Sequence, residues 1–368
     1  MPAMSSFPAR PSVLVVGCGG IGGVLGSRLL RADVDLTILT TNAAVRAAWL
    51  GEGPRLEGKL VGKTLDAEHV LASPEEAKRR YDVAFVAVQP PEVTNVGRSL
   101  IPLLSERGRV VCLPNGLCED RVGEIVGRER VVGAVVAWGA RMLAPGSYTK
   151  TSEGGFRVGT LSGAHDAELD AIVRLLETVG PVRLTDNLRG ARFSKLAINC
   201  AVSTIGTIGG RTVGELLGRA EVRRLALDIL TEAVDVARAD GIRLEKVIQL
   251  DLEWLAGLSK QRSKPKSAIQ HAVLFAVALR YRKMRSSMLA AIERGRPPAV
   301  DFLNGEIVSR GERLGVPTPV NRAARDVVWE IARGTRSAGF EALDETQTRG
   351  SNSLGSPSRS SSTQESAR

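Results

Sequence analysis

Cysteine and histidine are scarce in this chain of 368 residues. The cysteines are only four, Cys18, Cys112, Cys118 and Cys200. They form no C-x-x-C pair and have no histidine at metal-ligand spacing, which argues against a disulfide framework and against a metal site. Reduced thiols are typical of the cytoplasm. With three histidines present, a histidine-centred proton relay has little support, so another proton donor must be sought.

Long apolar runs are also missing. The longest candidates, such as residues 272–279, are far shorter than the roughly 18 apolar residues that a membrane span needs. The stretch before Val13 lacks the apolar core of a signal peptide. We therefore expect a cytoplasmic protein without a membrane partner.

Aromatic residues are few, whereas positive charge is plentiful. The formal net charge is +10, and basic side chains cluster in the segment 280–285, as they do in many nucleic-acid-binding proteins. No nucleic-acid motif is recognisable, however, and only seven Phe and three Tyr accompany this charge. Basic groups also serve phosphorylated cofactors and anionic substrates. We expect no nucleic-acid partner.

A glycine-rich segment follows the first apolar run. Residues 13–16 are apolar, and Gly17, Gly19 and Gly22 form a G-x-G-x-x-G directly after them. Between a strand and a helix, such glycines permit a tight turn, the approach of a pyrophosphate to the backbone, and close helix packing. The helix N-terminus then offers free N–H groups to the phosphates. The segment predicts a dinucleotide site formed by Gly17, Cys18, Gly19, Gly20, Ile21 and Gly22. A plain glycine-rich turn is the alternative.

Apolar strand patterns alternate with amphipathic helices over residues 12–186, which is the rhythm of a mostly parallel sheet. Strands are predicted at 13–16, 36–39, 83–88, 110–113, 131–136, 156–159 and 182–184, with a helix at 166–179. Over 187–337 the pattern is helical throughout. The predicted fold class is an α/β Rossmann-type dinucleotide-binding domain followed by an all-helical domain for substrate binding and dimerisation.

Both ends of the chain have a different composition. Residues 1–11 carry three prolines and are expected to be a disordered lead-in. Residues 338–368 become rich in Ser, Thr and Gln, and we expect a disordered polar tail because few apolar side chains are available for a core.

The end of the second predicted strand bears on the choice of cofactor. Folds specific for NAD usually place an Asp or Glu there to hold the ribose hydroxyl, and that carboxylate would repel the 2′-phosphate of NADP. This chain has Thr40, Thr41 and Asn42 instead, with Arg46 nearby. The pattern favours NADPH, with Thr41 among the cofactor-binding residues. A solvated position on the next helix is the alternative for Arg46.

Polar residues recur at helical spacing in the segment 193–203. Lys195, Asn199 and Ser203 stand at i, i+4 and i+8, and therefore close to one stripe of a helix whose other residues are largely apolar. Such a stripe must meet water, a partner or a ligand, because burying an unpaired lysine is expensive. A lysine that extends to the surface beside a solvated Asn199 is the alternative.

Six motifs occur in a characteristic order: Gly17–Gly22, Pro-Asn-Gly at 114–116, Lys195-x-x-x-Asn199, Ser-Ser-Met-Leu at 286–289, Asp-Phe-Leu-Asn-Gly at 301–305 and Gly-Val-Pro-Thr-Pro-Val-Asn at 315–321. Together they resemble the ketopantoate reductase family over about residues 12–335. The resemblance implies NADPH-dependent reduction of a 2-oxo acid to a 2-hydroxy acid, as for ketopantoate in pantothenate biosynthesis. It also implies a cleft between the two domains and suggests a homodimer.

The resemblance assigns roles to four residues. Lys195 is the general acid, Asn115 positions cofactor and substrate, Asn199 hydrogen-bonds the substrate, and Ser287 contacts its carboxylate. A positioned ammonium suits this chemistry, because hydride that arrives at a ketone carbon leaves negative charge on the oxygen. Two alternatives stay open: the Asn-Gly pair is also an ordinary turn signal, and Ser287 is also a candidate helix cap.

Three positions depart from the family pattern. Ser203 replaces a second substrate-binding asparagine but is still a donor and an acceptor. Gln89 replaces a cofactor-binding lysine, and Ala299 replaces a glutamate that is expected to hold the substrate hydroxyl. Asp301 lies two residues further on and should point elsewhere. A related 2-oxo acid without ketopantoate's terminal hydroxyl would lose little from Ala299.

Two other functions remain open. A β-hydroxyacid dehydrogenase also joins a dinucleotide-binding domain to a helical domain and has a K-x-x-x-N pair, although the motifs at 286–289 and 301–305 argue against it. A non-catalytic dinucleotide-binding protein is compatible with the departures at Gln89, Ser203 and Ala299.

Overall fold

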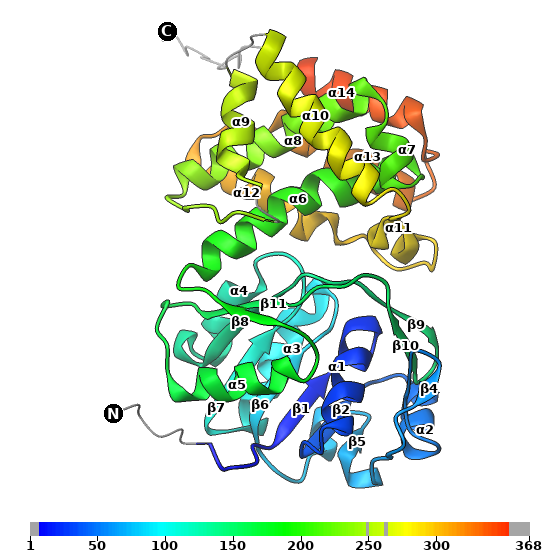
Figure 1. Ribbon diagram of the computed structural model, residues 1–368, viewed down its shortest axis with the longest axis vertical. Helices are drawn as coiled ribbons and strands as arrows, with labels where there is room; N and C mark the ends of the chain where they lie inside the picture. Colours follow the sequence, from blue (N-terminus) through cyan, green and yellow to red (C-terminus); the bar gives the residue numbers. More distant parts are fainter. Residues whose placement is uncertain (1–6, 248–249, 261–263, 353–368) are drawn as a thin grey trace, which may run out of the picture. The chain divides into compact units, whose positions relative to one another are not determined.

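The computed structural model describes residues 7–247, 250–260 and 264–352. The chain divides into two compact units (Figure 1). The first holds the chain up to Leu196 and a short return segment that begins at Ile242, and the second holds the other described residues. The division falls inside one helix, α6 (Leu188–Gly209). The first unit thus continues beyond residue 186, where the sequence pattern predicted its end, and includes the beginning of α6.

An eight-stranded sheet forms the centre of the first unit, in the order β12-β11-β8-β7-β6-β1-β2-β5. Its strands are β1 (Val13–Val16), β2 (Leu36–Leu39), β5 (Val70–Leu71), β6 (Tyr81–Val86), β7 (Leu104–Cys112), β8 (Val131–Val136), β11 (Phe156–Thr160) and β12 (Val182–Leu184). All neighbours run parallel except β8 and β11. The six strands from β5 to β8 have the 3-2-1-4-5-6 order of doubly wound dinucleotide folds. The predicted fold class is confirmed.

Helices cover both faces of this sheet, which explains why its central strands are continuous apolar runs. Its helices are α1 (Gly20–Arg31), α2 (Ala43–Leu50), α3 (Val93–Leu100), α4 (Cys118–Val126) and α5 (Ala167–Glu177). Alternate residues of β1 contribute to two cores, one with residues of α1 and α5 and the other with residues of α3 and α4. Phe7 is buried in the first core, so the predicted disordered lead-in does not hold at this residue. Residues 1–6 lie outside the described residues.

A second, four-stranded sheet was not predicted. Its order is β4-β3-β10-β9, from β3 (Arg55–Leu56), β4 (Lys59–Leu60), β9 (Ala140–Ala144) and β10 (Ser147–Lys150). It packs on α1 because that helix presents glycine. A Cβ on Gly20 would lie 2.6 Å from the Ala140 carbonyl oxygen, and a Cβ on Gly23 would lie 2.0 Å from the Tyr148 ring. The strands were missed because they are short and largely exposed on one side.

The second unit is helical, as predicted, and is coloured from green to red in Figure 1. Besides most of α6, it contains α7 (Val213–Leu217), α8 (Ala220–Ala239), α9 (Leu252–Lys260), α10 (Lys264–Arg280), α11 (Ser287–Ile292), α12 (Asn304–Leu314), α13 (Pro319–Ala332) and α14 (Phe340–Asn352). Local signals set several ends: Thr212 and Glu215 form a capping box at α7, and Gly315 ends α12 with φ of +69°. In the part of the chain that the structure describes, no helix is long and apolar enough to cross a membrane.

The predicted disordered tail is wrong over α14. Ala342, Leu343 and Thr346 are buried, and Arg349 forms ion pairs with Glu330 of α13 and Glu345 of α14. A few small buried side chains and an ion-pair network thus hold a helix whose composition is mostly polar. Residues 353–368, the rest of the predicted tail, lie outside the described residues.

A chain of buried polar side chains joins four helices of the second unit. Thr204 of α6 donates to the Asn304 Oδ1 atom at 2.6 Å, and Asn304 Nδ2 donates to Asn321 Oδ1 at 3.0 Å. Asn321 Nδ2 in turn donates to the Glu232 carboxylate of α8 at 2.7 Å. Thr204, Asn304 and Asn321 are fully buried. The asparagines of the motifs at 301–305 and 315–321 therefore serve to connect α6, α8, α12 and α13.

Candidate functional site

The predicted cofactor residues of the first unit lie at one edge of its sheet. The glycine segment follows β1, Thr41 follows β2, Gln89 follows β6 and Asn115 follows β7. These strands are parallel neighbours, so their carboxyl ends meet at the same edge. The strand order reverses between β1 and β6, and ligands of open α/β sheets bind at such a point.

The glycine loop has the shape of a phosphate cradle. Gly17 has φ of +89°, and a Cβ on Gly22 would lie 1.8 Å from the Gly17 carbonyl oxygen, so both positions require glycine. A Cβ on Gly19 would meet open space, and no side chain caps the N-terminus of α1. The first turn of α1 contains no acidic residue. Free N–H groups at this helix N-terminus fit the pyrophosphate of a dinucleotide.

A buried hydrogen-bonded pair supports the loop from behind. The Tyr148 hydroxyl donates to the Cys18 carbonyl at 3.2 Å and accepts from the Trp49 indole N–H at 3.1 Å. Both rings are fully buried. The Cys18 thiol is itself buried, which raises its pKa to about 12 and keeps it neutral. Cys18 can therefore contribute only through its backbone, whose carbonyl Tyr148 fixes.

The end of β2 carries a guanidinium and no carboxylate. Arg46 Nη1 donates to the Thr40 carbonyl at 2.7 Å, so this half-buried side chain is tied to the strand end rather than merely solvated. Asn42 caps α2 by accepting from the Val45 N–H, while Thr41 is exposed. The arrangement offers a cation and a hydroxyl where a 2′-phosphate would lie.

Gln89 and Asn115 occupy the two loops next to the glycine segment. Gln89 is exposed and follows Val88, whose side chain would lie 2.9 Å from a Cβ on Gly17. Asn115 is exposed, and its carbonyl accepts from the Cys118 thiol at 3.4 Å at the start of α4. Gly116 has φ of +89°, so the Asn-Gly pair does form a turn. That turn also presents the Asn115 side chain at the carboxyl edge of the sheet.

Lys195 lies at the same edge, on the part of α6 that belongs to the first unit. Its ammonium donates to the carbonyl of Val136, the last residue of β8. The side chain is half-buried. Burial and the nearby Arg192 guanidinium lower the pKa of Lys195 to about 7, against the opposing effect of Glu119. An amine with this pKa can donate and accept a proton near neutral pH.

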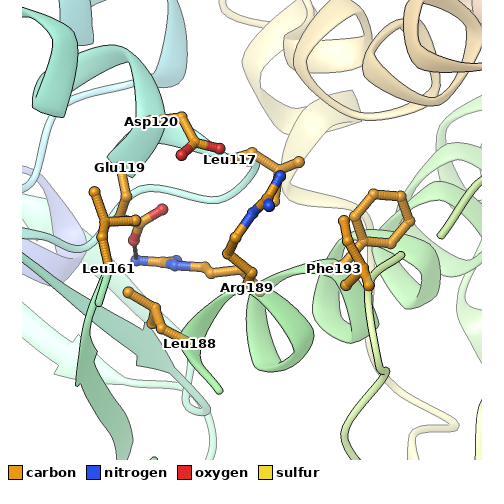
Figure 2. A pocket seen from close by; sticks show the side chains of 9 residues that line it. Leu117, Glu119, Asp120, Leu161, Leu188, Arg189 and Phe193 are labelled. Carbon is orange, nitrogen blue, oxygen red and sulfur yellow. Dashed lines mark ion pairs between the residues drawn. The ribbon is translucent and has the colours of Figure 1, made fainter. Parts of the chain in front are cut away.

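Arg192 and Glu119 form an ion pair, and the charges of both act on Lys195. Only 3% and 4% of their side chains are exposed. Arg192 Nη1 donates to the Pro114 carbonyl at 2.9 Å, and Nη2 donates to the Cys112 carbonyl at 2.5 Å. Burial raises the pKa of Glu119, and Arg192 opposes that effect. The pair borders a small pocket that Leu117, Leu161, Leu188 and Phe193 also line (Figure 2).

The remaining predicted substrate residues belong to the second unit. Asn199 is half-buried, and its side chain forms no hydrogen bond among the described residues. The Ser203 and Ser286 hydroxyls are 3.3 Å apart, and Thr207 lies 2.8 Å from Ser286. Ser286, not Ser287, caps α11 by accepting from the Leu289 N–H. Ser287 is exposed and follows Ser286 directly in the chain. The role of helix cap, which was the alternative for Ser287, therefore belongs to Ser286.

Ala299 stands where the family has a glutamate, and Asp301, two residues further on, does not take the place of that carboxylate. Ala299 begins the short helix η6 (Ala299–Phe302). The Asp301 carboxylate accepts from the Trp329 indole N–H at 3.1 Å and is thereby held against α13. Within the described ranges, no three His, Cys, Asp or Glu side chains lie close enough to hold a metal ion.

The chain consists of a dinucleotide-binding α/β domain joined to a helical domain. The order of the strands and the glycine loop define the first domain, and the helices of the second unit define the other. Residues 13–163 match the family described as ketopantoate reductase PanE/ApbA, and residues 187–332 match the C-terminal domain of ketopantoate reductase PanE/ApbA. The chain belongs to the ketopantoate reductase family, which confirms the resemblance drawn from its motifs.

Alignments with individual relatives extend over most of the chain. The 2-dehydropantoate 2-reductase of Archaeoglobus fulgidus is 24% identical over 325 residues, which are 88% of this chain and 98% of the relative. The crystal structure of a PanE/ApbA family ketopantoate reductase from Ralstonia eutropha has a TM-score of 0.69 and 24% identity, covering 91% of this chain and 99% of its own. D-mandelate dehydrogenase, in a complex with NADH and anilino(oxo)acetate, has a TM-score of 0.72 at 18% identity with the same coverage.

Sequence reasoning missed three buried side chains near the candidate site. Arg192 could have been found from the sequence, because it precedes Lys195 by three residues and such spacing brings two side chains together on a helix. Glu119 and Tyr148 carried no such signal, because each meets its partner only through the tertiary fold.

Proposed function

We propose that this protein reduces a 2-oxo acid to a 2-hydroxy acid with NADPH. The observation that carries the proposal is the position of Lys195 at the carboxyl edge of the sheet, with its ammonium on the Val136 carbonyl and a pKa of about 7. A reduced nicotinamide dinucleotide, bound on the glycine loop, would supply the hydride. Lys195 then stabilises and protonates the oxyanion that forms at the substrate carbonyl.

The other groups bind and orient. The backbone N–H groups from Gly17 to Gly22 bind the pyrophosphate, and Thr41, Arg46 and Gln89 face the rest of the dinucleotide. The preference for NADPH over NADH rests on the Arg46 guanidinium, fixed at the end of β2 where no carboxylate stands. Asn115 positions the nicotinamide and the substrate.

Asn199 and Ser203 follow Lys195 at helical spacing on α6, and we assign them to the substrate together with Ser287. Asn199 offers an amide that no other described side chain uses. Homodimerisation through the helical unit and a cytoplasmic location are part of the proposal, and the four reduced, buried cysteines agree with the latter.

Two substrates of one class are candidates. Ketopantoate is the substrate that the names of several relatives indicate. A 2-oxo acid without a terminal hydroxyl is favoured by Ala299, because no carboxylate remains there and Trp329 holds Asp301. A purely apolar pocket distinguishes substrates that differ by a hydroxyl by only about 100-fold, whereas a site built to bind the hydroxyl discriminates far more.

The experiment measures NADPH and NADH oxidation by the purified full chain with ketopantoate and with trimethylpyruvate, its hydroxyl-free analogue. We expect turnover with both acids, little loss for trimethylpyruvate, and a preference for NADPH. Dinucleotide binding without turnover of any 2-oxo acid would favour the non-catalytic alternative. Oxidation of 3-hydroxy acids with NADP, without 2-oxo-acid reduction, would favour a β-hydroxyacid dehydrogenase.

A further inference from the structure

Stability alone does not account for the buried pair Arg192–Glu119. Buried ion pairs generally stabilise a fold no better than apolar side chains of the same volume. This one leaves Arg192 Nε without a hydrogen-bond partner among the described residues. It also restricts β8, because a Cβ on Gly133 would lie 2.7 Å from the Glu119 Oε1 atom. Figure 2 shows Glu119 beside Leu161 on one side of the pocket, with a dashed line that marks its ion pair.

The two guanidinium bonds point to a role for the pair. Arg192 donates to the carbonyls of Cys112 and Pro114. These two residues flank Leu113, and Pro114 directly precedes Asn115. The forked guanidinium therefore holds two successive points of the segment that leads from β7 into the Asn115 turn. Glu119, in the first turn of α4, holds the other side of the guanidinium just after that turn.

Lys195 follows Arg192 by three residues on the same helix, so the two side chains occupy neighbouring turns. One rigid unit thereby connects the proposed general acid with the proposed nicotinamide-positioning asparagine. We propose that Arg192 and Glu119 are a positioning pair of the reductase, which fixes the Asn115 turn relative to Lys195 and keeps the electrostatic environment of that lysine balanced. This inference rests on the roles assigned under the proposed function.

The balance has a definite sign. Among the described residues, the charged groups that act on Lys195 are Arg192 from its own helix and Glu119 from α4. From β7, the Cys112 thiol stays neutral because burial raises its pKa well above the ordinary range, and β8 contributes the uncharged Val136 carbonyl. Arg192 disfavours the ammonium and Glu119 favours it. Neutralising Glu119 should therefore lower the pKa of Lys195, whereas neutralising Arg192 should raise it as long as Glu119 stays ionised.

Competitive acetylation of the full chain across a pH series, read by mass spectrometry at Lys195, measures this pKa without turnover. Glu119→Gln is expected to lower the midpoint and Arg192→Met to raise it.

Kinetics provide a second measurement. If the wild type turns over, the pH profiles of kcat/KM should show the same two shifts. Arg192→Met should also lower kcat by about 100-fold, since small displacements of positioned groups have effects of that order. Arg192→Lys keeps the charge without the fork, so it should lower kcat while leaving the midpoint near that of wild type.

Arg109→Met is the matched control, because Arg109 likewise joins a carboxylate, Asp166, and a backbone carbonyl, that of Glu129, within the first unit. It should leave the Lys195 midpoint unchanged. Equal or absent shifts in the Glu119 and Arg192 variants would overturn the inference, even in an active enzyme. Opposite shifts in a chain that reduces no 2-oxo acid would support the electrostatic coupling and refute the proposed function instead. Should Arg192→Met not fold, the Glu119→Gln midpoint decides: a lower value supports the pair, and an unchanged value refutes it.

Discussion

In the first unit the most buried ionic groups lie at the carboxyl edge of the sheet, whereas in the second unit buried polar side chains connect helices to one another. Arg192 and Glu119 border the Asn115 turn and Lys195. Thr204, Asn304, Asn321 and Glu232 form one hydrogen-bonded chain through four helices. In both arrangements each buried polar side chain has a partner, although Arg192 Nε has none among the described residues.

The difference between the two arrangements is one of charge. A buried ion pair changes the potential at neighbouring titratable groups, because screening by water is weak there. In the second unit the asparagine and threonine side chains are neutral and change it little, and burial raises the pKa of Glu232, at the end of their chain, to about 7. Each unmade hydrogen bond among these side chains carries the full cost of desolvation. We infer that disturbing the first unit's pair mainly changes proton transfer, and that disturbing the second unit's chain mainly changes stability.

The largest effect is expected at Lys195. Lys195→Met removes the proposed general acid and should lower kcat by about 10²- to 10⁴-fold, while dinucleotide binding, measured by fluorescence titration, is retained. The protonated amine is the form that donates, and its pKa is about 7. Wild-type kcat/KM for reduction should therefore fall as pH rises through about 7. Lys63→Met, at an exposed lysine paired with Asp33, is the control and should keep wild-type turnover. Undiminished turnover in Lys195→Met would remove the assignment.

An intermediate effect, on stability, is expected at Asn304. Asn304→Leu keeps the branching of this fully buried side chain but removes its amide, so that Thr204 Oγ1 and Asn321 Oδ1 lose their partner. The free energy of unfolding should fall by about 2–4 kcal/mol, and hydrogen exchange should rise in α12 and α13 but not in β6 or β7. Thr346→Val removes one hydroxyl bond, to the Ala342 carbonyl, and should cost less. If exchange rose equally in both units, the contrast between them would be lost.

The smallest effect is expected at Tyr148. Tyr148→Phe leaves the Cys18 carbonyl and the Trp49 N–H without their shared partner and so loosens the glycine loop. The Kd for NADPH should rise by about 3- to 10-fold, as expected for the loss of one or two neutral hydrogen bonds. Tyr81→Phe, at the opposite end of the sheet in β6, is the control and should bind as wild type does. An unchanged Kd in Tyr148→Phe would show that the second sheet, through Tyr148, does not contribute to cofactor binding.

Local patterns were sufficient for most of the framework. The strands at 13–16, 36–39 and 131–136 were predicted at their observed positions, because both faces of a parallel sheet are covered and such strands are continuous apolar runs. The second sheet was missed because β3 and β4 have only two residues each and β9 is largely exposed. α14 was missed because its helix depends on ion pairs with α13, which composition does not reveal.

The candidate site divides in the same way. Gly17, Gly19 and Gly22 were recognisable by their spacing directly after an apolar run, and Gly17 and Gly22 each meet a local steric demand. Lys195 was recognisable because helical spacing aligned it with Asn199. Their assigned roles remain proposals. The ion pair between Arg192 and Glu119 spans 73 positions of the chain, and the bond from Tyr148 to Cys18 spans 130.

The sequence by itself determined the glycine loop, the strand–helix alternation, the helical second unit and the family, since these depend on local sterics, periodicity and the order of short motifs. Only the tertiary structure decided which groups surround Lys195, what holds the Asn115 turn and what supports the glycine loop. The physical reason is that burial, hydrogen-bond partners and the electrostatic potential at a site depend on residues far apart in the chain.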